Sequence, residues 1–264
     1  MLAAIVLGVT WVGGLPFRYL AAIIALMVFY EWMRMTRPET GSAWRDGGLG
    51  IVPAILMFCC AVVIVANPTG LLPLAIIVGL AIVVAVAATL RKSGMWDAAG
   101  LAYATLSGLA LAALREGGHA GLVAILFLFA VVWVTDSAAY FVGRAVGGAK
   151  LAPSISPGKT RSGAIGGLAG GVVAGLLVAY FAGSGNLAAL AVIALILSIV
   201  SQAGDLFESW IKRRHGKKDS GSIIPGHGGV MDRVDGLVAA AVALYLIGSL
   251  SGGMSAPANA LFPA

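Results

Sequence analysis

The stretch GLVAILFLFAVVWVTDSAAYFVGR, residues 121–144, is apolar over most of its length and carries one acid, Asp136, two helical turns before Arg144. A helix of roughly 20 apolar residues is long enough to cross the hydrocarbon core of a bilayer. The whole chain shares this character: of its 264 residues, 60% are hydrophobic and only 11% are charged, whereas about a quarter of the residues in a soluble domain are charged. The sequence therefore predicts an integral membrane protein.

Apolar runs of similar length recur along nearly the whole chain. Residues 1–14 are apolar too, but no basic residue precedes them and they contain no clear cleavage site, which favours a short first span or a re-entrant segment over a cleaved signal peptide. We predict an all-α, polytopic bundle of eight to nine transmembrane helices, one integrated membrane domain with an N-terminal part (1–118) and a C-terminal part (119–264). The expected spans are 19–35, 51–66, 71–90, 97–114, 120–142, 163–182, 187–210 and 231–250.

The basic residues predict the orientation of this bundle. All but two of the 17 fall on one side of the predicted topology, and Arg18 and Arg115 fall on the other. Short loops rich in Lys and Arg stay in the cytoplasm, so the basic side is expected to be cytoplasmic. Topology and contact with anionic lipids account for the net charge of +6, and nucleic acid is therefore not expected as a partner.

Carboxylates recur near the cytoplasmic ends of three expected helices. Asp136 is in one, Asp205 and Glu208 are in another, and Asp232 and Asp235 open the last span. Because a carboxylate within a membrane span is costly, it tends to face a polar cavity or a partner. Three helices thus bring acids to about the same depth, which predicts a metal or phosphate site at the cytoplasmic face.

One helical face at the end of span 187–210 combines hydroxyl, carboxylate and ammonium groups, because residues 3 or 4 apart are neighbours on a helix. Such a face is suited to a hard cation and an adjoining phosphate. Asp232 and Asp235 also share a face, although helix capping is an equally good interpretation for Asp232 alone. The first face contains Ser201, Asp205, Ser209 and Lys212.

The segment SPGKT, residues 156–160, ends like a P-loop, but Pro153 stands where that motif requires its first glycine. Ser156, Lys159 and Thr160 are expected in a turn ahead of a helix, where they could hold phosphate oxygens. A basic loop that only sets topology is the alternative.

Small residues crowd the next span at the spacing that favours close helix packing. The same face could also border a ligand cleft, and it suggests a homodimer. Its glycines are Gly163, Gly166, Gly167, Gly170, Gly171 and Gly175.

The run SWIKRRHGKKDSGSIIPGHGGVMDRVD, residues 209–235, resembles the signature of the phosphatidate cytidylyltransferases (CDP-diacylglycerol synthases). TDSAAYFVGRAVG and ISPGKT resemble further elements of that family, so the resemblance covers roughly residues 130–245. After the K-T pair the family has an aromatic or apolar residue, Glu and Gly; here Arg161, Ser162 and Gly163 follow, without a carboxylate. The signature positions are filled by Ser209, Lys212, Arg213, Lys218, Asp219, Gly221, Pro225, His227, Gly228, Gly229, Asp232, Arg233 and Asp235.

The resemblance implies that CTP and phosphatidate react to give CDP-diacylglycerol and pyrophosphate, in a bacterial cytoplasmic membrane with the site facing the cytoplasm. A phosphate monoester carries about −1.5 to −2 charge at neutral pH, so this reaction needs alignment and charge neutralisation rather than a strong base.

On this basis we expect Mg²⁺ as cofactor, and the number of acids allows a second cation. Catalytic roles are expected for Asp205, Lys212, Asp232 and Asp235, with the metal held by Asp205 and Asp232 and supported by Asp235. Lys159 and Lys212 would contact phosphates, whereas Asp219 and His227 would shape the nucleotide loop. Substrate-binding roles are expected for Asp136, Ser156, Lys159, Thr160, Ser209, Lys218, Asp219, His227 and Arg233.

Three other classes of membrane protein are alternatives to a cytidylyltransferase. A transporter suits intramembrane acids and glycine-rich helices, but the centres of these spans are almost free of charge. A CTP-dependent lipid kinase would release CDP rather than pyrophosphate. The D-G-x-x-A-R pattern of CDP-alcohol phosphotransferases fails at DGLVAA, residues 235–240, which lacks the Arg.

Overall fold

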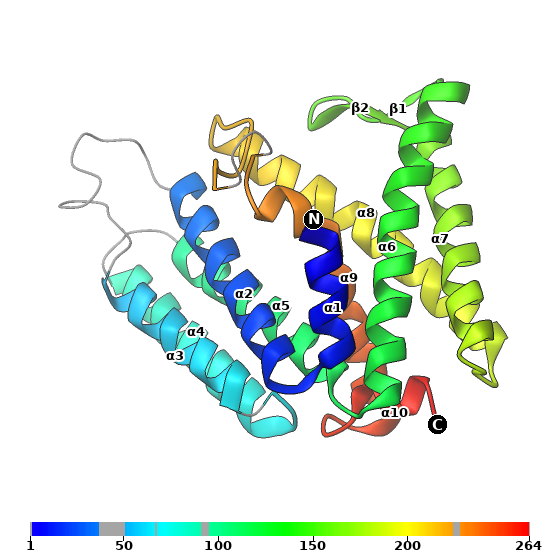
Figure 1. The fold of residues 1–264 in the computed structure, drawn as a ribbon. Helices are drawn as coiled ribbons and strands as arrows, with labels where there is room; N and C mark the ends of the chain where they lie inside the picture. Colours follow the sequence, from blue (N-terminus) through cyan, green and yellow to red (C-terminus); the bar gives the residue numbers. More distant parts are fainter. Residues whose placement is uncertain (1, 37–50, 67, 91–94, 224–227, 264) are drawn as a thin grey trace.

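The computed structural model describes residues 2–36, 51–66, 68–90, 95–223 and 228–263 (Figure 1). Within these ranges each of the eight expected apolar runs is helical, and six helices are long and apolar enough to cross a membrane. The chain is an integral membrane protein built from helices. The six are α2 (Gly14–Thr36), α5 (Trp96–Arg115), α6 (His119–Val146), α7 (Arg161–Phe181), α8 (Leu187–Arg214) and α9 (Met231–Gly252).

All but one of the remaining helices are shorter than these six. The 11 residues of α1 (Leu2–Val12) extend ~16 Å at 1.5 Å per residue, about half of the hydrocarbon thickness, so α1 does not cross the core alone. The hairpin of α3 (Ile51–Ala66) and α4 (Leu71–Leu90) lies at the edge of the bundle (Figure 1). In the C-terminal tail, α10 (Pro257–Leu261) buries Ala258 against the bundle.

Helix α9 connects the two parts of the bundle. It packs against α8 and α6 of the C-terminal part and against α5 and α2 of the N-terminal part. Within those parts, α6 lies along α7 and α2 lies along α5 (Figure 1). The start of α9, which carries Asp232 and Asp235, is therefore in contact with both.

The glycine-rich face of α7 is used for packing inside the chain. A Cβ at Gly163 would lie 2.6 Å from the carbonyl oxygen of Ala139, and one at Gly171 would clash with the hydroxyl of Thr135. Such contacts let the backbones of α6 and α7 approach closely. The prediction of close helix packing is confirmed, and α6 occupies the face that had suggested a dimer.

The two basic residues on the sparsely charged side cap helices. Arg115 donates from Nε to the carbonyl of Thr10 (2.6 Å) and from Nη2 to that of Trp11 (3.2 Å), at the end of α1. Arg18 donates to the last carbonyls of α3 and forms an ion pair with Glu116 (2.8 Å). Carbonyls at helix C-termini lack intrahelical partners, so these arginines have structural roles.

A short hairpin of strands β1 (Lys150–Ala152) and β2 (Ser156–Thr160) connects α6 to α7, with Lys150 opposite Thr160 and Ala152 opposite Ser156. The expectation that 156–160 form only a turn was wrong. Gly147 and Gly148, with positive φ, end α6, and the next residues are extended. The two extended segments satisfy each other's backbone groups outside the helical layer.

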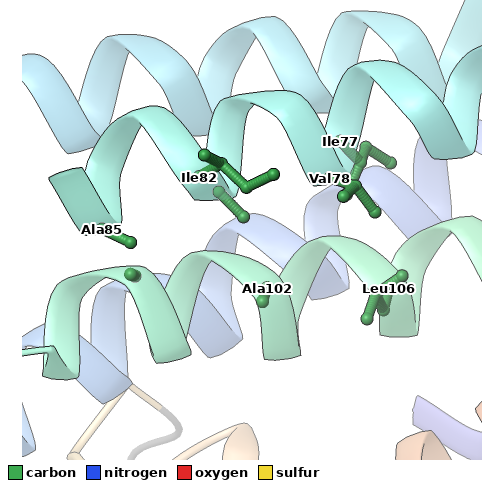
Figure 2. A pocket seen from close by; sticks show the side chains of 8 residues that line it. Ile77, Val78, Ile82, Ala85, Ala102 and Leu106 are labelled. Carbon is green, nitrogen blue, oxygen red and sulfur yellow. The ribbon is translucent and has the colours of Figure 1, made fainter.

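An apolar cavity of about 320 Å³ lies between α4 and α5 (Figure 2). Ile77, Val78, Ile82 and Ala85 of α4 lie opposite Ala102 and Leu106 of α5. Its lining offers no group for acid, base or metal chemistry, so the functional site lies elsewhere.

We expect Gly171→Val to lower the free energy of unfolding by about 1–3 kcal/mol, because overpacking a tight interface forces backbone shifts. Gly79→Ala is the matched control, since a Cβ at Gly79 meets nothing within 4 Å. Unfolding of the purified proteins by SDS titration from mild detergent would measure both. Equal stability of the two variants would contradict close packing at Gly171.

Candidate active site

The polar residues singled out from the sequence gather at one end of the bundle. The β1–β2 hairpin, the segment after α8 and the beginning of α9 all lie there (Figure 1). Two lysine–carboxylate clusters occupy this end, one at the hairpin and one at the start of α9.

The first cluster joins β2 to α8. Lys159 Nζ lies 2.5 Å from Asp205 Oδ2, and the hydroxyl of Ser209, one turn later, donates to Asp205 Oδ1 over 3.4 Å. Both charged side chains are about a third exposed (28% and 33%). The pair is therefore accessible to a ligand from the adjoining cavity.

That cavity has a volume of about 560 Å³ and lies between α6, the hairpin, α7 and α8. It brings together four of the predicted site residues, namely Asp136, Lys159, Thr160 and Asp205, with Arg144 and Lys150 adding positive charge. A polar cavity with both charge signs is suited to an anionic ligand and a cation.

Thr160 lines this cavity, and its hydroxyl contacts that of Ser162 (3.1 Å). The Thr160 hydroxyl caps α7 by accepting from the backbone N–H of Gly163 (3.1 Å). Ser162, which stands where the family pattern has Glu, donates its hydroxyl to the carbonyl of Gly147 at the end of α6. Ser162 thus ties α7 to α6.

The second cluster centres on Lys212. Its Nζ lies 2.6 Å from Asp232 Oδ1 and 3.3 Å from Glu208 Oε1. Glu208 is fully buried and, within the described residues, neither of its oxygens accepts a hydrogen bond with good geometry. Lys212 is therefore the cation that offsets two carboxylates.

The predicted polar face of α8 divides between these clusters. Asp205 and Ser209 turn toward Lys159, whereas Lys212 turns toward α9. Ser201 is fully buried and donates to the carbonyl of Ser198 within its own helix. Ser201 thus lies outside both clusters.

Asp232 does more than the capping interpretation predicted. Its Oδ2 accepts from the backbone N–H groups of Ser220 (3.1 Å) and Gly229 (3.0 Å), while Oδ1 receives Lys212. These bonds hold Ser220 and Gly229, which precede α9, rather than the first turn of the helix itself. Asp232 thus links these two residues to α8.

The carboxylates have the donor chemistry that Mg²⁺ prefers, and Asp136, Asp205 and Asp235 lie within electrostatic range of one another. Among the described residues, however, no group of three His, Cys, Asp or Glu side chains is arranged to hold a metal. Asp205 and Asp232 are each paired with a lysine instead. The metal role of Asp205, Asp232 and Asp235 stays a prediction.

Other predicted residues surround the clusters without lining the cavity. Ser156 is half-buried in β2, and Lys218, Asp219 and Arg233 are exposed near the start of α9. His227 lies outside the described residues. Their substrate-binding roles stay predictions.

Sequence reasoning missed Glu31 of α2, which is fully buried beside the second cluster. It accepts from the hydroxyl of Ser220 and from the N–H groups of Val230 and Met231. Glu31 is the only acid in the expected span 19–35, and that rarity is the signal that could have found it. Gln202, which lines the cavity, had no such signal.

Sequence comparison finds relatives along nearly the whole length of the chain. A model of the cytidylyltransferase family matches residues 1–251. A phosphatidate cytidylyltransferase of Brucella suis is 48% identical over 99% of this chain and 95% of its own length. Another of the same name, from Brucella abortus, is 49% identical over 95% and 90%. One from Haemophilus influenzae is 46% identical over 46% of this chain and 43% of its own.

We expect Lys212→Met to destabilise the protein far more than Lys159→Met. Removing one member of a buried ion pair costs about 3–5 kcal/mol, and Glu208 and Asp232 are 0% and 15% exposed. Exposed pairs contribute about 1 kcal/mol or less, which is closer to the situation of Lys159 and Asp205. Unfolding in detergent would compare the two variants.

A double variant, Lys212→Met with Glu208→Gln, controls for the stranded charge and should recover part of the lost stability. Equal destabilisation by the two lysine variants would show that Lys212 does not neutralise a buried carboxylate.

Proposed function

The chain belongs to the cytidylyltransferase family, and on that premise we propose that it transfers the cytidylyl group of CTP to phosphatidate, giving CDP-diacylglycerol and pyrophosphate. The observation that carries the proposal is the polar cavity at the end of a membrane bundle, with the Lys159–Asp205 pair in its wall. A water-soluble nucleotide and a lipid headgroup can meet only at such a boundary.

The chemistry requires one bond to form and one to break. A phosphate oxygen of phosphatidate attacks the α-phosphorus of CTP, and pyrophosphate leaves with the electron pair of the broken P–O bond. The phosphate is already anionic at neutral pH, so no strong base is needed. Arg144, Lys150 and Lys159 around the cavity offset the triphosphate charge.

Lys212 adds a further positive charge beside the phosphates, and Asp232 holds its ammonium group in place. Mg²⁺ would be held by Asp205 and Asp232 with support from Asp235, and when bound it supplies further charge neutralisation. The proposal also includes a second metal ion at the same site. Lys218, Asp219 and Arg233 would contact the nucleotide from the exposed side of the site, with His227.

The proposal places the site on the cytoplasmic side of a bacterial cytoplasmic membrane. Its support is the gathering of basic residues at the end of the bundle that holds the cavity. Helices α3 and α4 would cross as well, the 16-residue α3 with local thinning of the bilayer. A homodimer would need a surface other than the glycine face of α7, which packs on α6.

The test uses the purified chain in detergent with phosphatidate, Mg²⁺ and CTP labelled either in the cytosine or at the γ-phosphate. The expected result is cytosine label in the lipid and pyrophosphate in the water. Label from the γ-phosphate in the lipid would identify a kinase instead. If neither label is transferred while a known cytidylyltransferase is active in the same assay, the transporter hypothesis is favoured again. The replacement of the family's Glu by Ser162 would then be the first candidate cause of inactivity.

We expect Asp232→Asn to lower kcat by about 10²–10³-fold, because the neutral amide no longer orients Lys212. The control is Asp97→Asn, which also removes an acid from the first turn of a helix but lies in α5. Initial rates of CDP-diacylglycerol formation would measure both, alongside the melting temperature. Full activity of a folded Asp232→Asn protein would refute the role of Asp232.

A further inference from the structure

We propose that Glu31, in the N-terminal part of the chain, is a positioning residue for the active site. It holds Ser220 and the first residues of α9 and thereby sets the place of Asp232 and Lys212. This inference rests on the proposed function, because it assigns Glu31 a part in the same reaction.

Glu31 binds Ser220, which follows α8, and the two residues at which α9 begins. Its Oε2 accepts from Ser220 Oγ (3.0 Å) and from the N–H of Met231 (2.7 Å), and its Oε1 accepts from the N–H of Val230 (2.9 Å). Val230 and Met231 begin α9, where backbone N–H groups lack intrahelical partners and the helix dipole favours negative charge. Glu31 therefore caps α9 from another helix.

Glu31 and Asp232 hold the same two pieces of chain. Ser220 donates its hydroxyl to Glu31 and its backbone N–H to Asp232. Gly229 donates its N–H to Asp232, and the next residue, Val230, donates to Glu31. If Ser220 and Val230 moved away from Glu31, the two N–H donors of Asp232 would therefore move as well. The other carboxylate oxygen of Asp232 accepts from Lys212.

The neighbouring glycines make this close approach possible. A Cβ at Gly221 would lie 2.7 Å from Glu31 Oε1, and one at Gly229 would lie 2.6 Å from Glu31 Oε2 and clash with Ser220 Oγ. Gly228 has φ +84°, which side chains other than glycine rarely adopt. Gly221 and Gly229 are thus explained by their close approach to Glu31, and Gly228 by its backbone conformation.

The next residue on α2 fixes Glu31 in place. Trp32 is buried, donates from Nε1 to the carbonyl of Trp96 (2.9 Å) and has its ring 5.4 Å from that of Tyr103. Both contacts anchor α2 to α5. Since Glu31 itself is fully buried and does not line the 560 Å³ cavity, it acts through Asp232 and Lys212 rather than on substrate.

The experiment compares Glu31→Gln, Glu31→Ala and Ser220→Ala with Thr36→Val. Glu31 is the acceptor in its three bonds to Ser220, Val230 and Met231. Gln keeps the shape of Glu, but its NH₂ group would face an N–H donor. Thr36→Val is the matched control: Thr36 is also buried in α2, and among the described residues its hydroxyl bonds only the carbonyl of Trp32.

Loss of a residue that supports a functional side chain lowers activity by about 10–100-fold. We expect that loss in kcat for both Glu31 variants, a smaller one for Ser220→Ala, and less than twofold change in KM for phosphatidate. The rate is expressed per nucleotide-binding site, counted with labelled CTP, because a purely structural role would reduce the number of sites and leave kcat per site unchanged.

Hydrogen exchange at Ser220 and at Gly229–Met231 supplies a readout that does not depend on activity. Exchange there should be faster in the Glu31 variants and unchanged in Thr36→Val. Wild-type kcat per site in a folded Glu31→Ala protein, or unchanged exchange, would overturn the inference. If the wild-type chain transfers no cytidylyl group while exchange responds as expected, the proposed function fails and the cap on α9 stands.

Discussion

A carboxylate inside an apolar helical bundle must have a partner, and this requirement organises one end of the molecule. Burying an isolated charge is far more costly than the contribution of any single packing contact. Three acids at this end each have a specific donor: Asp205 has Lys159, Asp232 has Lys212, and Glu31 has the beginning of α9. These pairings join β2 to α8, α8 to α9 and α2 to α9, so they also hold the elements around the site together.

The packing of the bundle allows those pairings to form. Helix α7 lies close enough to α6 for the hairpin to reach α8 only because glycine faces α6 at Gly163 and Gly171. At the other end of the bundle, Arg18 and Arg115 satisfy carbonyls of α3 and α1. Glycine contacts and helix caps thus replace the hydrophobic driving force that is missing between helices in lipid.

Much of this fold could be predicted from the sequence, because length and hydropathy alone determine which segments can be membrane helices. The sequence also singles out Asp136, Asp205 and Asp232, because a carboxylate within a membrane span is costly and therefore rare. The hairpin was missed because its pairing depends on how α6 and α7 end, and the division of the α8 face between two clusters depends on where neighbouring helices lie. The rarity of an acid in its span could have singled out Glu31, but its partners are about 190 to 200 residues away in the chain, a separation that no local pattern spans.

The two lysine–carboxylate pairs also limit how substrate can bind. If Lys159 and Lys212 contact the phosphates of CTP, as proposed, their positive charge is shared between those phosphates and the carboxylates of Asp205 and Asp232. Glu208 is fully buried beside Lys212, so the loss of that charge would be costly there. Under the proposed function, a divalent cation held by Asp205 and Asp232 would supply further positive charge beside the carboxylates. Charge balance would then favour binding of nucleotide and metal together over binding of either one alone.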